Sequence, residues 1–169
     1  MIRVLHMIGS LNIGGSQALI MNIYRKIDKD FIQFDFIVDH DEQLFFAEEI
    51  QSLGGRVFIL PGFNGRNLFE VKRAWHNFFL NHPEYYILHS HVRSYAAVFI
   101  PIAKKYGIYT IIHSHSTSNG EGLVSIAKTT MQYPLRYQAD FFFGCSRESG
   151  NGPHMRASPK MHIPVLQDW

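Results

Sequence analysis

The sequence of 169 residues has a single cysteine, Cys145, which excludes an intramolecular disulfide framework and fits a reducing compartment. It also lacks a charge excess of either sign: 16 basic and 14 acidic residues give a formal net charge of +2, too small to indicate nucleic-acid binding. No apolar run approaches the ~20 residues that a membrane-spanning helix needs. The N-terminus reaches Asn12 too early for a signal-peptide core, and no cleavage site of small residues follows. We therefore expect a cytoplasmic protein.

The residues that are present are typical of one globular domain. Apolar residues make up 46% of the chain and charged residues 18%. A chain of this length buries roughly 70% of the surface that its unfolded form exposes, so it needs no disulfide or metal to fold. Two features are unusual: 14 phenylalanines, and 10 histidines, of which four form the His-Ser-His triplets at 89–91 and 113–115.

Short apolar runs alternate with segments of helical periodicity along most of the chain. We expect strands at 2–8, 34–38, 57–60, 86–88, 109–112 and 141–145, and helices at about 17–27, 43–53, 67–80, 95–106 and 121–138. This alternation predicts an α/β domain spanning about 1–149, a Rossmann-like parallel sheet of at least six strands with helices on both faces. The segment 150–169 holds three of the seven prolines and no sustained period, so we expect an irregular tail foreign to the domain.

Ligands of such sheets bind outside the carboxyl ends of the strands, and the first of these ends carries a glycine-bearing loop. Gly9, Gly14 and Ser16 match the two glycines and the hydroxyl of a P-loop, but Gly15 stands where the lysine is needed, which excludes an NTPase of that type. What remains is a glycine loop before a helix N-terminus, an arrangement that favours an anionic ligand. The alternative is a plain tight turn between strand and helix.

The two His-Ser-His triplets end neighbouring expected strands and have three interpretations. His89 and His91 share one side of an extended strand, as do His113 and His115. The four side chains could bind Zn²⁺, with Asp39 or Asp41 as a further ligand. They could equally be structural imidazoles at strand ends, or one of them could contact or deprotonate a substrate. The residues alone leave these three interpretations open.

Four motifs occur in one order along the chain. Gly14-Gly-Ser-Gln17 follows the first strand, His89-Ser-His91 ends the fourth, a glycine at 107 precedes His115 by eight residues, and 139–146 reads Ala-Asp-Phe-Phe-Phe-Gly-Cys-Ser. Together they resemble the N-terminal half of family-4 retaining glycosyltransferases of the GT-B fold, especially bacterial capsule and exopolysaccharide enzymes. The resemblance covers about 1–149, and Gln17 departs from the acidic residue that this family commonly has after the glycines.

The resemblance implies a role for several residues. His115 is implied as the active-site histidine, with His113 as the second choice, and it would contact the transferred sugar or assist the acceptor hydroxyl. The residues implied to bind donor or acceptor are Gly14, Gly15, Ser16, His91 and Arg93. The resemblance implies no metal and no cofactor, because positive charge and helix dipoles hold the leaving diphosphate in such enzymes.

The function implied is transfer of a sugar from a nucleotide-sugar donor to a glycan acceptor, lipid-linked, in cell-surface polysaccharide synthesis. The family's second domain, which grips the nucleotide, has no counterpart in the sequence, so we expect this polypeptide to be inactive alone. Helix 67–80 combines Lys72, Arg73 and His76 with many apolar residues, which suggests peripheral contact with the cytoplasmic membrane or, alternatively, a core helix. The other functions considered are a stand-alone module that binds glycan or nucleotide sugar, and a zinc hydrolase built on the His-Ser-His pairs.

Overall fold

The computed structural model of the chain describes residues 1–40, 44–114 and 133–144. In this part, six strands form one sheet in the order β3-β2-β1-β4-β5-β6, and every neighbouring pair is parallel. The strands are β1 (Ile2–Gly9), β2 (Ile32–Val38), β3 (Val57–Ile59), β4 (Ile87–Ser90), β5 (Tyr109–Ser114) and β6 (Phe141–Gly144). The predicted fold class, a Rossmann-like α/β sheet of six strands, is confirmed.

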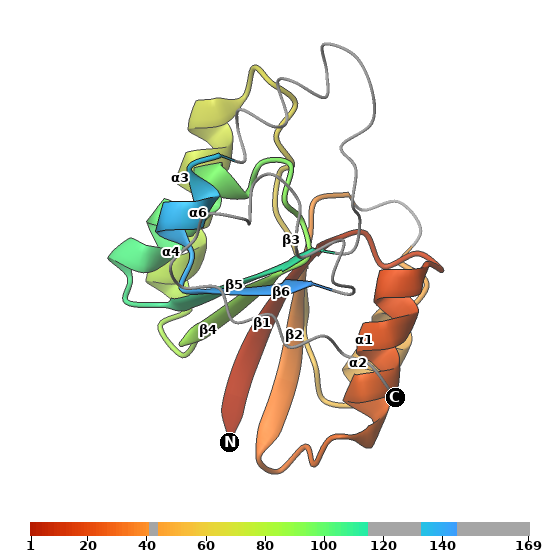
Figure 1. The fold of residues 1–169 in the computed structure, drawn as a ribbon. Helices are drawn as coiled ribbons and strands as arrows, with labels where there is room; N and C mark the ends of the chain where they lie inside the picture. The colour runs from red at the N-terminus through yellow and green to blue at the C-terminus, as the bar shows by residue number, and fades with distance from the viewer. Residues whose placement is uncertain (41–43, 115–132, 145–169) are drawn as a thin grey trace.

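Helices cover both faces of this sheet (Figure 1). One layer holds α3 (Leu68–Asn81), α4 (Ala96–Lys105) and α6 (Leu135–Gln138), and the other holds α1 (Gly15–Lys26) and α2 (Ala47–Ser52). The sheet therefore separates two apolar cores. Trp75 of α3 stacks on Phe99 of α4 in the larger core, at a centroid separation of 4.4 Å. Tyr24 of α1 packs on Phe34 and Phe36 of β2 in the smaller one.

The expected elements agree with the structure except at their ends. Helix α2 begins at Ala47, several residues later than the expected start at 43. The amide of Phe46 donates to the carbonyl of Leu11, so the residue before the helix is bonded to the first loop and not to a helical turn. Strand β4 continues through Ser90, so His89 belongs to the sheet. Of the helix expected at 121–138, only its last part, α6, lies among the described residues, and the tail at 150–169 lies outside them.

A buried carboxylate joins three elements near the amino ends of the strands. Asp35 of β2 is fully buried and accepts hydrogen bonds from Arg3, Arg56 and Tyr85. Burial alone would raise the pKa of Asp35, but these hydrogen bonds outweigh it and hold the pKa below its ordinary value. This cluster lies away from the carboxyl ends of the strands, so its role is structural.

No helix within residues 1–40, 44–114 and 133–144 is both long enough and apolar enough to cross a membrane.

Candidate functional site

The strand order reverses direction between β1 and β4, which makes their carboxyl ends the topological switch point of the sheet. Chain segments from three strands meet there. The carbonyl of Gly9, at the end of β1, accepts from the amide of Asp39 after β2, and a Cβ on Gly9 would lie 3.3 Å from Cγ2 of Val92 after β4. Gly9 also has a φ of 77°, a conformation that glycine adopts without strain. The loops after β1, β2 and β4 therefore share one edge.

The loop after β1 leads into α1, and Gln17 fixes its shape. The Nε2 of Gln17 donates to the carbonyl of Ser10 at 3.1 Å, and Ser16 Oγ donates to Gln17 Oε1 at 2.8 Å. Gln17, which stands where the resembled family commonly has an acidic residue, thus ties the loop to the first turn of the helix. A Cβ on Gly14 would lie 2.6 Å from Gln17 Oε1, so this glycine makes room for that side chain.

Gly15 differs from Gly14 because nothing lies within 4 Å of the position that its Cβ would take. It is exposed and begins α1, whose first turn has no acidic residue and no side-chain cap. The first amides of a helix have no partner within the helix, and the helix dipole places partial positive charge there. The open backbone at Gly15 therefore has the chemistry of an anion-binding helix end.

Arg93 supplies a positive charge at the same edge of the sheet, three residues beyond the end of β4. Its guanidinium is half-buried, and desolvation lowers its pKa from the ordinary value. Among the described residues, no carboxylate pairs with it. The nearby acid Asp39 instead accepts from Tyr95 Oη at 2.7 Å and from His40. A desolvated cation without a counter-ion is costly, and an anionic ligand would remove that cost.

Four histidines gather on the α1 face of the sheet, close to this edge. They come from β1, β4, the residue after β4, and β5: His6, His89, His91 and His113. The ring centroids of His89 and His91 are 4.4 Å apart, and His113 lies 5.4 Å from His89 and 5.2 Å from His91. His6 Nδ1 lies 3.1 Å from His91 Nε2, and the planes of the two rings are nearly parallel. The strands thus bring together both histidines of the first triplet, one histidine of the second, and His6.

His6 is the member of this cluster that the sequence interpretation missed. It is almost fully buried, and burial, with a further contribution from His113, lowers its pKa to about 3. It is therefore neutral at physiological pH. The available signal was register: in a sheet that places β1 beside β4, His6 pairs directly with His89.

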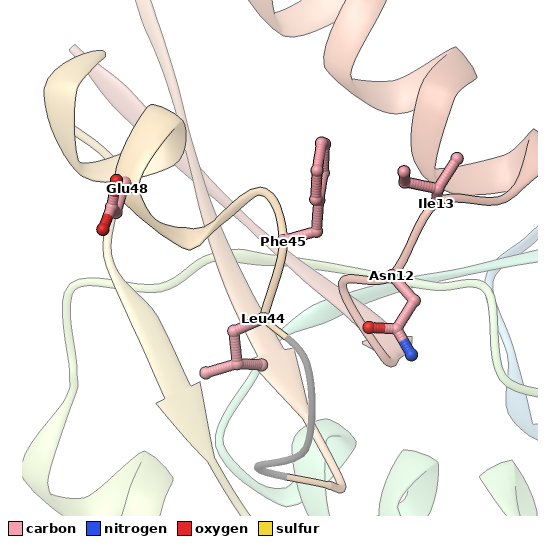
Figure 2. Close-up of a pocket in the computed structure, with 5 residues that line it drawn as sticks. All are labelled: Asn12, Ile13, Leu44, Phe45 and Glu48. Atoms are coloured by element: carbon pink, nitrogen blue, oxygen red, sulfur yellow. The ribbon is translucent and has the colours of Figure 1, made fainter.

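The sheet edge also borders an open pocket of about 820 Å³ (Figure 2). It is lined by Asn12, Ile13, Leu44, Phe45 and Glu48. Ile13 precedes the Gly14-Gly15 pair, and Phe45 precedes α2, so the pocket lies between the first loop and the start of that helix. Both of these apolar side chains are largely exposed, at 74% and 63%. Apolar walls with a few polar groups are common in sites for organic ligands.

Of the remaining residues predicted to belong to the site, some lie in the part of the chain that the structure describes and others do not. His113 is buried on β5, between His89 and Phe143. His115, the implied active-site histidine, lies outside the described residues. The zinc interpretation also named Asp39 or Asp41 as a ligand. Asp41 lies outside the described residues. In the described part of the chain, the side chains placed to hold an ion are three histidines, and Asp39 is not among them.

Comparison with known proteins identifies two similar ones. The chain is 34% identical over 117 residues to a Bacillus subtilis (strain 168) protein named "Putative glycosyltransferase EpsF", a match that covers 69% of this chain and 30% of that protein. The crystal structure of Acinetobacter baumannii MurG superposes with a TM-score of 0.61 at 9% identity, covering 98% of this chain and 46% of that one. No family model matches. The chain therefore spans less than half the length of either protein. The resemblance to GT-B glycosyltransferases and the half-GT-B fold are confirmed.

Proposed function

We propose that this chain is the acceptor-side, N-terminal domain of a glycosyltransferase that moves a sugar from a nucleotide-sugar donor to a glycan acceptor in cell-surface polysaccharide synthesis. The observation that carries the proposal is the open backbone at Gly15, at the N-terminus of α1 and at the switch point of the sheet. The similarity to a protein named as a glycosyltransferase supports the reaction class.

The charge arrangement at the edge suits a nucleotide sugar. The diphosphate is the anion that the first amides of α1 and Ser16 would face, and Gly15 leaves room for it. Arg93, without a carboxylate partner in the described part of the chain, would neutralise part of the charge that develops on the leaving diphosphate. These groups would act by holding the leaving group.

The acceptor would enter beside the first loop. The pocket between Ile13 and Phe45 offers apolar surface for a glycan, with Asn12 and Glu48 as polar contacts (Figure 2). His91 lies at the same edge of the sheet and lines the acceptor cleft, while His115 contacts the transferred sugar or assists the acceptor hydroxyl. Transfer to a hydroxyl needs such a group within hydrogen-bond reach of the proton.

A lipid-linked acceptor would place the enzyme at the cytoplasmic membrane surface, and α3 has a suitable face. Phe69 and Leu80 are 79% and 67% exposed and lie eleven residues apart, about three helical turns, so they share one side of the helix. Lys72 and Arg73 lie between them and are exposed. Phe79, by contrast, is buried in the core, so the apolar part of this face is narrower than the sequence suggests.

We propose further that the chain is inactive alone. It spans 30% of the length of the Bacillus protein and 46% of MurG, and GT-B sites are completed when two domains close around the donor. The second candidate function is a stand-alone module that binds glycan or nucleotide sugar, which the same open helix end would serve.

One experiment separates the two functions. The gene is read beyond codon 169, the full-length protein is purified, and acceptor-dependent release of nucleoside diphosphate from nucleotide sugars is measured for the full-length protein and for this chain. Transfer by the full-length protein alone is expected. Binding of nucleotide sugar by both proteins without transfer by either would support the binding module instead.

A further inference from the structure

The histidine cluster has a property that sugar transfer does not use. One ring nitrogen from each of His6, His89 and His91 can be chosen so that the three nitrogens all lie within 4.8 Å of one another. His6 is buried, whereas His89 and His91 are half-buried, so the group is partly accessible. His6 lies on β1 and His89 on the neighbouring strand β4, with His91 directly after it. Backbone hydrogen bonds between these two segments fix the spacing of the three residues.

We propose that His6, His89 and His91 form a binding site for one divalent transition-metal ion of the Zn²⁺ class. The site is separate from the diphosphate site at α1, and it goes beyond the proposed sugar transfer.

The spacing of the nitrogens supports this site. Ligands at about 2.0 to 2.1 Å from a tetrahedral Zn²⁺ lie about 3.3 Å from one another. His6 Nδ1 and His91 Nε2 already lie 3.1 Å apart, and the planes of their rings are nearly parallel. Two neutral imidazoles at this distance form one N–H···N hydrogen bond. A metal ion can bind both facing nitrogens once the donating ring carries its proton on its other nitrogen, because each facing nitrogen then offers a lone pair. For the three nitrogens that lie within 4.8 Å of one another, no pair is more than about 1.5 Å wider than this separation of about 3.3 Å.

The donor set also selects the kind of ion. Imidazole nitrogens suit Zn²⁺, Cu²⁺, Ni²⁺ and Co²⁺, whereas Mg²⁺ and Ca²⁺ require oxygen ligands. Three neutral histidines do not compensate the charge of the ion. They also leave the fourth coordination position of a tetrahedral ion open to water or an anion. Phe34 packs against the ring of His6 at a centroid distance of 4.3 Å, so this ligand is preorganised.

The test uses the 169-residue chain without an affinity tag, stripped of metal by a chelator. Titration with Co²⁺ is expected to give the visible absorption of a nitrogen-ligated ion, saturating at one equivalent, and Zn²⁺ is expected to abolish that absorption by displacement. Because the chain has ten histidines, variants must locate the site. His89→Ala and His91→Ala are each expected to weaken Co²⁺ binding by at least about 100-fold, since even loss of a residue that only hydrogen-bonds to a metal ligand costs about 10- to 100-fold.

The matched control is His76→Ala, on α3 in the other helix layer, which is expected to bind Co²⁺ as the unchanged protein does. His6→Gln completes the set, and circular dichroism shows which variants fold. If His6→Gln fails to fold, the two half-buried positions still decide the question. Absence of the absorption in the unchanged chain, or unchanged Co²⁺ affinity in both His89→Ala and His91→Ala, would overturn the proposal. Neither result depends on whether the full-length protein transfers sugar.

Discussion

His6 Nδ1 on β1 lies 3.1 Å from His91 Nε2, just after β4, and the planes of the two rings are nearly parallel. A residue in the centre of the sheet thus holds the imidazole that we place in the acceptor cleft. Since the two strands are neighbours at the switch point, this bond links the core to the edge where ligands bind.

This link predicts a measurable coupling between the two histidines. In a double-mutant cycle, His6→Ala and His91→Ala should be non-additive in the free energy of unfolding by about 0.5 to 3 kcal/mol, as expected of residues in direct contact. Urea denaturation of the four proteins measures it. The pair His6→Ala and His76→Ala, from opposite faces of the sheet, should be additive within about 0.5 kcal/mol. Additivity in the first cycle would mean that the bond contributes nothing.

Two glycines should respond in opposite ways to the same change. Gly15→Ala meets open space at the start of a helix, so the free energy of unfolding should stay the same or rise by up to about 1 kcal/mol. Gly55→Ala would place its Cβ 2.6 Å from the carbonyl oxygen of Phe34 and should destabilise the protein by about 1 to 3 kcal/mol. In the full-length protein, only Gly15→Ala should weaken binding of the nucleotide sugar without loss of stability. Unchanged binding would remove Gly15 from the site.

Asp35 should make the fold sensitive to acid. Its pKa is lower in the folded protein than in the unfolded chain, where an aspartate titrates near 3.9, so its contribution to stability is complete above that pH and is lost as the pH falls below it. Asp35→Asn should cost about 3 kcal/mol at neutral pH, because the buried Arg3 contact loses its counter-charge, and should flatten the acid dependence.

The control for Asp35 is Asp30→Asn, at an exposed position in the turn before β2. It should change the free energy of unfolding by less than about 0.5 kcal/mol. Urea midpoints between pH 3 and pH 7 measure both variants. If Asp35→Asn and the unchanged protein lose stability in parallel as the pH falls, then another group causes the loss of stability in acid.

Membrane contact through α3 predicts that the full-length protein co-sediments with vesicles that contain anionic lipid, and less with neutral ones. Phe69→Ala and the charge variant Lys72→Gln should each reduce binding, the latter by about 1 kcal/mol at low ionic strength. Phe45→Ala removes another largely exposed ring, which belongs to the pocket, so it is the matched control. Equal, negligible sedimentation with both vesicle types would leave α3 as a core helix with three exposed apolar residues, Leu68, Phe69 and Leu80.

The sequence predicts the sheet well because each strand is a short apolar run between segments of clear helical periodicity. Phe34–Val38 is such a run in β2, and Val71–Phe79 has the helical spacing in α3. It predicts strand ends less well, since polar residues such as His89 and Ser90 stay in the sheet when neighbouring strands pair with them. It misses His6 because a lone histidine in an apolar strand has no local signal. Only the strand order, which depends on tertiary packing, places it against the first His-Ser-His triplet.

Acceptor-dependent release of nucleoside diphosphate by the full-length protein tests the central claim most directly. The unchanged protein should release it from at least one nucleotide sugar, and His115→Ala should slow that release by about 10²-fold, as loss of a positioned acid–base group does. His113→Ala should mainly lower stability, because this side chain is buried against His89 and Phe143. A folded full-length protein that releases no nucleoside diphosphate, or a His115→Ala variant at the unchanged rate, would contradict the account.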